Sequence, residues 1–479
     1  MSVQDLALQR DKYRHLTDEE WRWFLQQVEG RERTADKLPT FAQIEDWWYP
    51  VRLSCEQCSS ELAARYKASL VESQKVPSGT PINVESCMVD LTGGYGVDTY
   101  FLSERFAHTD YVEQNEELCR IAEHNFNVQS DNVRCTFNVQ SDNVRCTKVN
   151  VQHNFNVQSD NVRCTFNVQS DNVRCTKVNV HHSSAEEFLE TAGEYDLIFL
   201  DPARRDSHGG KVFRLEDCTP NVVELLPTLL RHGKQVMLKL SPMLDLTQAI
   251  NKLQSDNVQC TKVSVHNTSA EEFLKTAGDN VQSDKGTKDQ ELQSDKGTKY
   301  QVTKWDVHVV AIKNEVKEVL VVSRLSLEDR PQTITCIDLV EPEKAFVFTK
   351  EQETNCPLAI NPSPLAFIYE PSAAILKAGA YKLVGARYGL QKLDVNTHLY
   401  CSERLVTDFP GRKWKIEQVV RDRKDLPAEL KQANVLTRNY PMTPEQLKKK
   451  LHLRDGGTAY LIGARIQGKP TVLRATLIP

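Results

Sequence analysis

The sequence of 479 residues has no run of about 18 consecutive apolar residues, the length that a membrane-spanning helix needs. Its first twenty residues contain no apolar core of the kind found in secretory signals, so we expect no such signal. The thirteen cysteines are an odd number spread over a long chain, which does not fit a disulfide framework. These absences favour a cytoplasmic protein that has no membrane partner.

A complete zinc site is also missing. Cys55 and Cys58 have the spacing of half a site, but no second pair of ligands follows at a plausible distance. Half a site cannot complete a tetrahedron, so we expect no metal.

The chain as a whole has no large excess of charge of one sign, since its formal net charge is −5. Residues 411–479, however, carry 15 of the 60 Lys and Arg residues and only 6 of the 65 Asp and Glu residues. A basic segment on an acidic body is expected where only that segment approaches a polyanion. A solvated basic face without a partner explains the composition equally well.

Changes in residue pattern divide the chain into four predicted segments. Residues 1–80 read as a helical domain, in which Thr17 precedes three acids and an apolar helical repeat. Residues 81–325 alternate strands and helices, residues 326–408 form an α+β connecting region, and residues 409–479 form the basic domain.

The alternating segment predicts an α/β fold with a parallel, doubly wound sheet. The strands are expected at Ser86–Leu91, Thr109–Glu113, Asp196–Asp201, Gln235–Leu240, Trp305–Lys313 and Val316–Ser323. Helices are expected at Val97–Ala107, Glu116–Asn125, Ser184–Ala192, Val222–Leu230 and Leu244–Leu253. Only Asn314-Glu315 separates the last two strands, which should therefore pair antiparallel as a hairpin.

Near-verbatim repeats interrupt this pattern at about 124–181 and 253–299. His124–Gln152 and His153–His181 are 29 residues each and differ only at the last position. Repeats of solenoid proteins diverge while keeping a pattern, so we interpret these as passengers in helix-to-strand loops, away from the ligand edge of the sheet. One copy supplies a short strand through the alternation of Val178 and Val180 with polar residues.

The first motif with chemical content runs from Asp90 to Gly96. A buried strand ends in Asp90, and the chain then turns through glycines into a helix whose N-terminus favours negative charge. A dinucleotide fingerprint would need a third glycine where Thr99 stands, and Asp90 would repel a pyrophosphate. A nicotinamide enzyme is therefore the weaker interpretation, and Asp90 suits a ligand with a positively charged amino group.

Two further acids end neighbouring strands. Glu113 ends the second strand, where a carboxylate can accept both hydroxyls of a ribose. Asp201 ends a later strand and is followed by Pro202, Ala203, Arg204 and Arg205. Taken alone, Asp90 and Glu113 could be helix-capping acids; their order along the chain favours one ligand site.

At these residues the sequence resembles the class I S-adenosylmethionine-dependent methyltransferases. It is most similar to a group typical of Bacteroidetes that carries a C-terminal THUMP-like domain. The matching stretches are Glu56–Ser60, Asp201–Arg205, Leu238–Pro242, Pro410–Lys413 and Thr437–Pro441. The resemblance implies a Rossmann-like seven-stranded methyltransferase sheet, a helical N-terminal domain and an α+β THUMP-like C-terminal domain. It also implies S-adenosylmethionine as the cofactor and RNA, either rRNA or tRNA, as the partner.

Carried over residue by residue, the resemblance predicts the cofactor contacts. Asp90 and Thr92 would lie near the amino end of the ligand, and Gly94 and Gly96 would lie beneath its methionine portion. Glu113 would hold the ribose. Ser184, which stands where many relatives have an acid, would meet the adenine together with the strand end at Asp201.

The acceptor side is predicted at Asp201 and Pro202, with the base to be methylated nearby. No aromatic residue follows at the fourth position of this motif, and Ser241 stands where methylation of pyrimidine C5 would need a cysteine. RNA contacts are predicted for Arg204, Arg205, Arg412, Lys413, Lys415, Lys448 and Lys449, although Arg204 and Arg205 could instead pair with Asp206 and Glu216. The altered motif leaves an alternative open, namely a catalytically silent RNA-binding or assembly factor that retains the fold.

Overall fold

The computed structural model describes residues 3–71, 86–131, 158–159, 162–163, 177–203, 214–254, 302–326, 331–360 and 365–479. The N-terminal part is helical, with α1 (Val3–Ala7), α2 (Asp18–Thr34), α3 (Pro39–Ala42), α4 (Arg52–Gln57) and α5 (Glu61–Leu70). As expected, α2 begins at Thr17 in a capping box with Glu20, because each residue's side chain bonds the other's backbone N–H.

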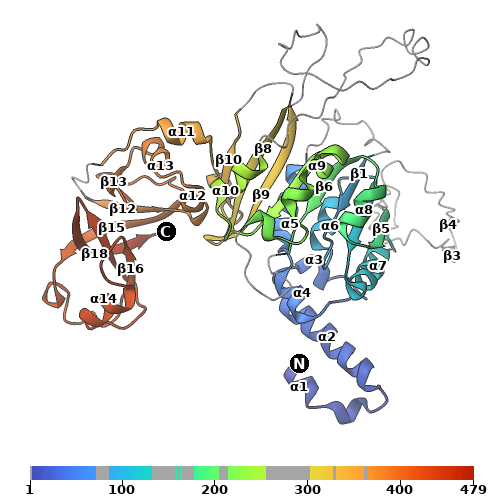
Figure 1. The fold of residues 1–479 in the computed structure, drawn as a ribbon. Helices are drawn as coiled ribbons and strands as arrows, with labels where there is room; N and C mark the ends of the chain where they lie inside the picture. The colour runs from blue at the N-terminus through green and yellow to red at the C-terminus, as the bar shows by residue number, and fades with distance from the viewer. Residues whose placement is uncertain are drawn as a thin grey trace, which may run out of the picture.

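The central sheet has nine strands in the order β11-β10-β8-β9-β7-β6-β1-β2-β5 (Figure 1). Their bounds are β1 (Cys87–Asp90), β2 (His108–Glu113), β5 (Lys177–His182), β6 (Tyr195–Leu200), β7 (Gly233–Leu240), β8 (Val302–Ile312), β9 (Glu315–Ser326), β10 (Ile334–Asp338) and β11 (Phe346–Phe348). The first five of these pair parallel to one another, and β7 pairs antiparallel with β9. Seven strands, β1 to β9 without the isolated pair β3 (Gln158–Ser159) and β4 (Val162–Arg163), form the predicted Rossmann-like sheet, and β10 and β11 extend it.

The predicted terminal hairpin is present, but its turn lies one residue earlier than expected. β8 and β9 pair antiparallel with Ile312 opposite Glu315, so the two-residue turn is Lys313-Asn314. Both turn residues have positive φ, 52° and 60°, which suits the twist of a tight hairpin. The extension by β10 lies in the segment that the sequence assigned to a connecting region, and β10 joins β8 in parallel.

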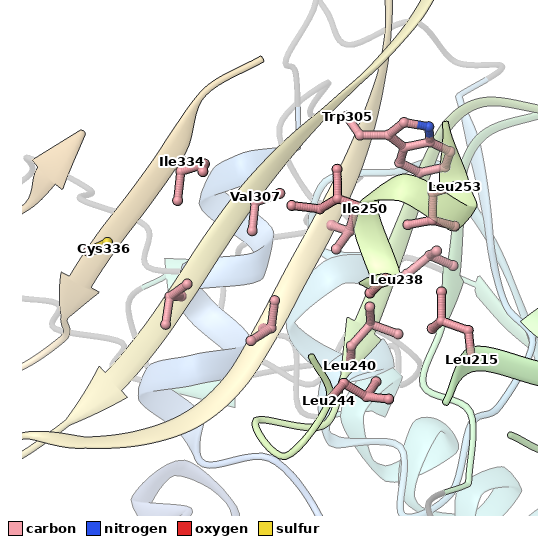
Figure 2. Packing of buried hydrophobic residues seen from close by; sticks show 14 of the residues in the cluster. Leu215, Leu238, Leu240, Leu244, Ile250, Leu253, Trp305, Val307, Ile334 and Cys336 are labelled. Atoms are coloured by element: carbon pink, nitrogen blue, oxygen red, sulfur yellow. The ribbon is translucent and has the colours of Figure 1, made fainter. Parts of the chain in front are cut away.

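Helices cover both faces of the central sheet. They are α6 (Val97–Ser103), α7 (Glu116–Asp131), α8 (Ala185–Thr191), α9 (Val222–His232) and α10 (Leu246–Leu253). One apolar cluster joins α8, α9 and α10 to alternate residues of the strands, and Figure 2 shows part of it, with Leu238 and Leu240 of β7 facing Ile250 and Leu253. Two other clusters join α5, α6 and α7 to the opposite face. Side chains of a strand alternate between these faces, so Lys239, between Leu238 and Leu240, points to the opposite face, where it meets Asp98 of α6.

The C-terminal part forms a second sheet of seven strands in the order β13-β14-β12-β15-β18-β17-β16. Its strands are β12 (Phe367–Pro371), β13 (Gln391–Asp394), β14 (Thr397–Ser402), β15 (Gly411–Val420), β16 (Asn434–Arg438), β17 (Ala459–Ile466) and β18 (Lys469–Ile478). Its helices are α11 (Lys350–Asn355), α12 (Ala373–Ala378), α13 (Leu383–Arg387) and α14 (Pro444–Lys450). β12 pairs antiparallel with β15, so one sheet continues across the predicted domain boundary at residue 409.

The second sheet is attached to the first through α12, which packs on β8, β9 and β10 beside the central sheet (Figure 1). The backbone N–H of Ala373 donates to the side chain of Asn314, and Lys377 Nζ donates to the carbonyl of Leu244. One apolar cluster contains residues of both sheets, so the two are packed through a shared core.

Most of the repeat copies lie outside the described residues. His124 to Asp131 form the end of α7, and the strand predicted around Val178 and Val180 is present as β5, at the edge of the sheet. Among the residues that the structure describes, no helix is both long and apolar enough to cross a membrane.

Candidate active site at the carboxyl edge of the central sheet

The glycine-rich loop after β1 is held in a shape that only glycine allows at several positions. Gly94 and Gly96 have φ of 55° and 79°, in the left-handed region. A Cβ atom on Gly93 would lie 2.1 Å from the ring of Tyr111, whose hydroxyl donates to the carbonyl of Gly94 at 2.5 Å. The loop is therefore fixed from below by the buried Tyr111 and enters α6 at Val97.

Asp90 anchors this loop from inside the protein. Its side chain is buried; one carboxylate oxygen accepts from the backbone N–H of Thr92 at 3.0 Å, and the other accepts from Thr99 Oγ1 at 2.6 Å. Thr99, the residue that replaces the third glycine of a dinucleotide motif, thus binds the motif acid. Burial raises the pKa of Asp90 to about 7. The two hydrogen bonds lower this pKa, whereas the nearby carboxylates of Asp98 and Asp201 raise it further.

A variant can test the buried state of Asp90. A folded-state pKa of about 7, above the ordinary 3.8, means that the folded protein holds this proton more tightly than the unfolded chain does. The stability that Asp90 contributes is present at low pH and is lost as the pH rises from about 4 to about 7. Between pH 5 and pH 8 we therefore expect the unmodified protein to lose roughly 2–3 kcal/mol of unfolding free energy that Asp90→Asn does not lose. Urea unfolding at both pH values measures this difference, and equal losses in the two proteins would contradict it.

Glu113 lies at the end of β2, beside the same loop. Its carboxylate accepts from the backbone N–H of Gly94 at 2.9 Å and from that of Asn115 at 2.8 Å. A carboxylate has about four acceptor positions, so two remain for further donors. This arrangement leaves Glu113 able to accept hydroxyl groups next to the loop.

Asp201 follows β6 and is bonded directly to the loop. Its backbone N–H donates to Thr92 Oγ1 at 2.7 Å, so the end of β6 and the loop after β1 are one unit. Pro202 is buried, and the next residue, Ala203, forms a backbone bridge with Thr219. The backbone that carries Asp201 and Pro202 is therefore held on both sides.

The side chain of Asp201 forms an ion pair for which the sequence contains no motif. One carboxylate oxygen is 2.5 Å from Nζ of Lys239, which is 3% exposed and lies near the end of β7. Lys239 also lies 3.4 Å from Asp98, in the first turn of α6. Burial by itself would lower the pKa of Lys239, but Asp201 and Asp98 outweigh it and raise that pKa, so Lys239 is cationic.

The other predicted residues on this edge are placed as follows. Ser184 is the N-cap of α8, and its hydroxyl accepts from the backbone N–H of Glu187 in a capping box. Arg204 and Arg205 lie outside the described residues, so their predicted role remains a prediction.

The cysteine pair in the N-terminal part is bonded within the protein. Cys55 and Cys58 both donate to backbone carbonyls, and burial raises the pKa of Cys55 to about 12. No group of three potential metal ligands occurs in the described ranges.

The predicted RNA-binding residues of the C-terminal part differ in exposure. Arg412 donates from its guanidinium to the buried Glu370, which also binds Arg438. Lys413 is buried and donates to the carbonyl of Thr407. Lys415 and Lys449 are exposed, as is Lys450, whereas Lys448 pairs with Asp455 at 3.0 Å.

Comparisons with known proteins agree with this architecture. Residues 367–410 match the model of a ferredoxin-like domain, and residues 411–476 match that of a domain described as THUMP domain-like. A solved structure described as a "putative methyltransferase from Porphyromonas gingivalis W83" is similar with 26% identity and a TM-score of 0.66, covering 97% of this chain and 92% of that one. This match confirms the predicted resemblance and the predicted fold class.

Other solved structures match more weakly. An rRNA methylase from Streptococcus thermophilus has 9% identity and a TM-score of 0.26, with 55% of this chain and 94% of that chain covered. A SAM-dependent methyltransferase from Agrobacterium tumefaciens has 14% identity and a TM-score of 0.22, with 38% and 45% covered. Scores this low do not establish a shared fold. A search of curated proteins found no match.

Proposed function

We propose that this protein is an S-adenosylmethionine-dependent methyltransferase that transfers a methyl group to a base of RNA held beside Asp201. The observation that carries the proposal is the hydrogen bond from the backbone of Asp201 to Thr92. It joins a glycine loop suited to a cofactor with a carboxylate suited to an acceptor, at the edge of a doubly wound sheet where ligands bind. The fold shared with the Porphyromonas protein supports the same reaction class.

The residues of the loop fit such a cofactor. Gly94 and Gly96 bring the backbone close to a ligand without side chains in the way, and the N-terminus of α6 begins directly behind them. Glu113 has acceptor positions left for the two ribose hydroxyls. Asp90 fixes the loop from beneath, on the side where the amino end of the ligand would lie.

S-adenosylmethionine, when bound, supplies a methyl group that the adjacent sulfonium makes electrophilic. The protein then has to position an acceptor in line with that methyl group and exclude water. Asp201 would accept a hydrogen bond from the acceptor nitrogen and orient it, while Pro202 and the bridge at Ala203 keep the carboxylate in place. We assign the adenine side to the segment at Ser184, whose backbone is fixed by its capping box.

RNA is the proposed acceptor because a basic C-terminal part accompanies this site. Its match to a THUMP domain-like model and its exposed Lys415, Lys449 and Lys450 support contacts to phosphates. A base of single-stranded or structured RNA can be splayed out of its stack to reach Asp201.

Two measurements test the proposed function. Calorimetry should show that the intact protein binds S-adenosylmethionine, and mass spectrometry of nucleosides should show one methylated nucleoside that is lost in a strain without the protein. Purified protein should restore that methyl group to RNA from the deletion strain. Absence of cofactor binding would contradict the proposal. Binding without transfer to total RNA or ribosomal subunits would favour the silent assembly factor instead.

A charge-reversal variant tests the contribution of the basic surface. Removing residues from 411 onward would strip β15 from β12 and expose the buried Ile368, which packs in one cluster with Trp414, so truncation would confuse folding with binding. Point changes at three exposed lysines avoid this. We expect Lys415→Glu combined with Lys449→Glu and Lys450→Glu to weaken RNA binding tenfold or more and to flatten its salt dependence, because fewer counterions are released.

The control for this variant carries the same change of charge elsewhere on the surface. Lys12→Glu, Arg14→Glu and Lys350→Glu alter exposed positions outside residues 411–479. Filter binding or fluorescence anisotropy at several salt concentrations compares the three proteins. Equal affinities of the two triple variants would mean that the basic surface acts only through net charge.

A further inference from the structure

Five charged side chains form a continuous buried chain that ends at Asp201. In order they alternate in sign, and we call them the charge chain: Glu318, Lys67, Asp98, Lys239 and Asp201. The successive N–O distances are 2.7, 3.1, 3.4 and 2.5 Å. The side chain of Asp201 is 27% exposed, whereas none of the other four is more than 10% exposed. The chain therefore reaches solvent at its Asp201 end.

The charge chain is assembled from elements that are far apart in the sequence. Lys67 comes from α5 of the N-terminal part and Glu318 from β9 of the terminal hairpin. Asp98 lies two residues after Gly96, in the first turn of α6, and also accepts from Ser59 Oγ at 2.7 Å. Lys239 touches both Asp98, next to the cofactor loop, and Asp201, at the proposed acceptor position.

Stability alone does not account for such a chain. Removing charges from water is costly, and well-packed apolar residues in place of a buried ion pair are often equally stable or more stable. The same strand shows that apolar packing is available on this face, since Met237, two residues before Lys239, is buried in an apolar cluster there. The charges are placed instead where the cofactor loop, the acceptor strand and α5 meet.

We propose that Lys239 is a positioning residue that fixes the carboxylate of Asp201, in its ionised form, at the acceptor position, and that Asp98, Lys67 and Glu318 hold Lys239 in place. This inference rests on the proposed function. It makes α5, in the segment predicted as a separate N-terminal domain, a structural part of the acceptor site. It also explains why the strand end Leu238–Pro242 carries a lysine between two leucines.

The charged and titratable groups around the chain are consistent with this role. Asp201 faces Lys239 from β7, Asp90 from β1 and Cys218 from the segment before α9, and Lys239 faces Asp98 from α6. Lys239 additionally faces Glu318 and Cys58. Burial alone would raise the pKa of Asp98, but the cations of Lys67 and Lys239 lower it to about 2. Asp98 therefore remains anionic and keeps Lys239 cationic.

Variants at Lys239 test the proposal in the full-length protein. Lys239→Met should lower kcat for RNA from the deletion strain by about 100-fold, while the KM for S-adenosylmethionine changes by less than about threefold. Lys239→Arg keeps the positive charge and should recover at least a tenth of the lost rate.

A matched control lies on the same strand. Lys234 pairs with Asp196 at 2.8 Å at the other end of β7 and is 62% exposed, so Lys234→Met removes an equivalent ion pair without touching the charge chain. It should leave kcat and the KM for S-adenosylmethionine unchanged. A Lys239→Met protein that keeps the kcat of the unmodified protein would overturn the proposal.

Thermal unfolding provides a readout that does not depend on activity. In Lys239→Met the carboxylates of Asp98 and Asp201 lack the cation between them, so adding Asp201→Asn should raise the melting temperature. The double variant also serves if Lys239→Met alone fails to fold. If the unmodified protein methylates no RNA but this rescue is seen, the proposed function fails while the ionic link from Lys239 to Asp201 stands. If the rescue is absent, the link itself is wrong.

Discussion

The Asp201→Asn variant is expected to bind S-adenosylmethionine with nearly unchanged affinity and to lose methyl transfer by roughly 10²- to 10⁴-fold, the usual contribution of one positioned proton-accepting side chain. Asparagine preserves the shape of the side chain and the backbone bond to Thr92, so the cofactor loop should stay intact. The amide retains one carbonyl oxygen but lacks the negative charge that pairs with Lys239. The loss should therefore appear in kcat rather than in cofactor binding.

Single-turnover transfer of labelled methyl groups, together with calorimetry, measures both quantities. Asp196→Asn is the matched control, because Asp196 lies near the start of the same strand and pairs with the exposed Lys234. It should transfer methyl groups at the rate of the unmodified protein. If Asp201→Asn is as active as this control, Asp201 does not act on the acceptor, and the acceptor position has to be sought elsewhere along the edge.

The Gly93→Ala variant is expected to weaken cofactor binding and protein stability together. The added methyl group would lie 2.1–2.4 Å from three ring atoms of Tyr111, and that ring is fully buried. Tyr111 cannot move freely because its hydroxyl bonds the carbonyl of Gly94 and its ring packs edge-on against Phe126. Overpacking of this kind typically costs about 1–3 kcal/mol. A similar distortion of the loop would weaken S-adenosylmethionine binding by roughly tenfold or more, at about 1.4 kcal/mol per tenfold.

Gly193→Ala provides the control, since a Cβ atom there meets nothing within 4 Å. Calorimetry gives the cofactor affinity, and thermal unfolding gives the stability of the ligand-free protein. Lower stability with normal affinity would show that the loop recovers its shape when the ligand binds. Normal stability and affinity in Gly93→Ala would contradict the view that Tyr111 fixes the loop.

Much of the central sheet could be predicted because its signals are local. β1, β6 and β7 are short and mostly apolar, and the observed bounds of the six predicted strands fall within three residues of the predicted ones. The hairpin turn was placed at Asn314-Glu315 rather than Lys313-Asn314, because Asn favours turns whereas the positive φ of Lys313 has no signature in the sequence. β10 was missed as a member of this sheet, since its pairing with β8 depends on a partner distant in the chain.

In the basic C-terminal segment, composition does not distinguish buried cations from exposed ones. All of its lysines and arginines contribute equally to a count of charge, yet Lys413 is buried and Arg412 binds Glu370. Lys415 lies two residues further along the same strand and is exposed. The two lysines lie on the same face of β15, so the packing around each position, rather than alternation along the strand, decides which cation faces solvent.

The sequence by itself determined the order and type of the elements, the loop from Asp90 to Gly96 and the strand ends at Glu113 and Asp201. These features follow from residues close together in the chain, where glycine conformation and apolar periodicity act locally. Only the tertiary structure decided that Lys239 meets Asp201, and that Lys67 reaches Glu318, 251 positions away. A buried lysine carries no local signature, because its cost is offset by carboxylates that come from other elements once the fold has formed.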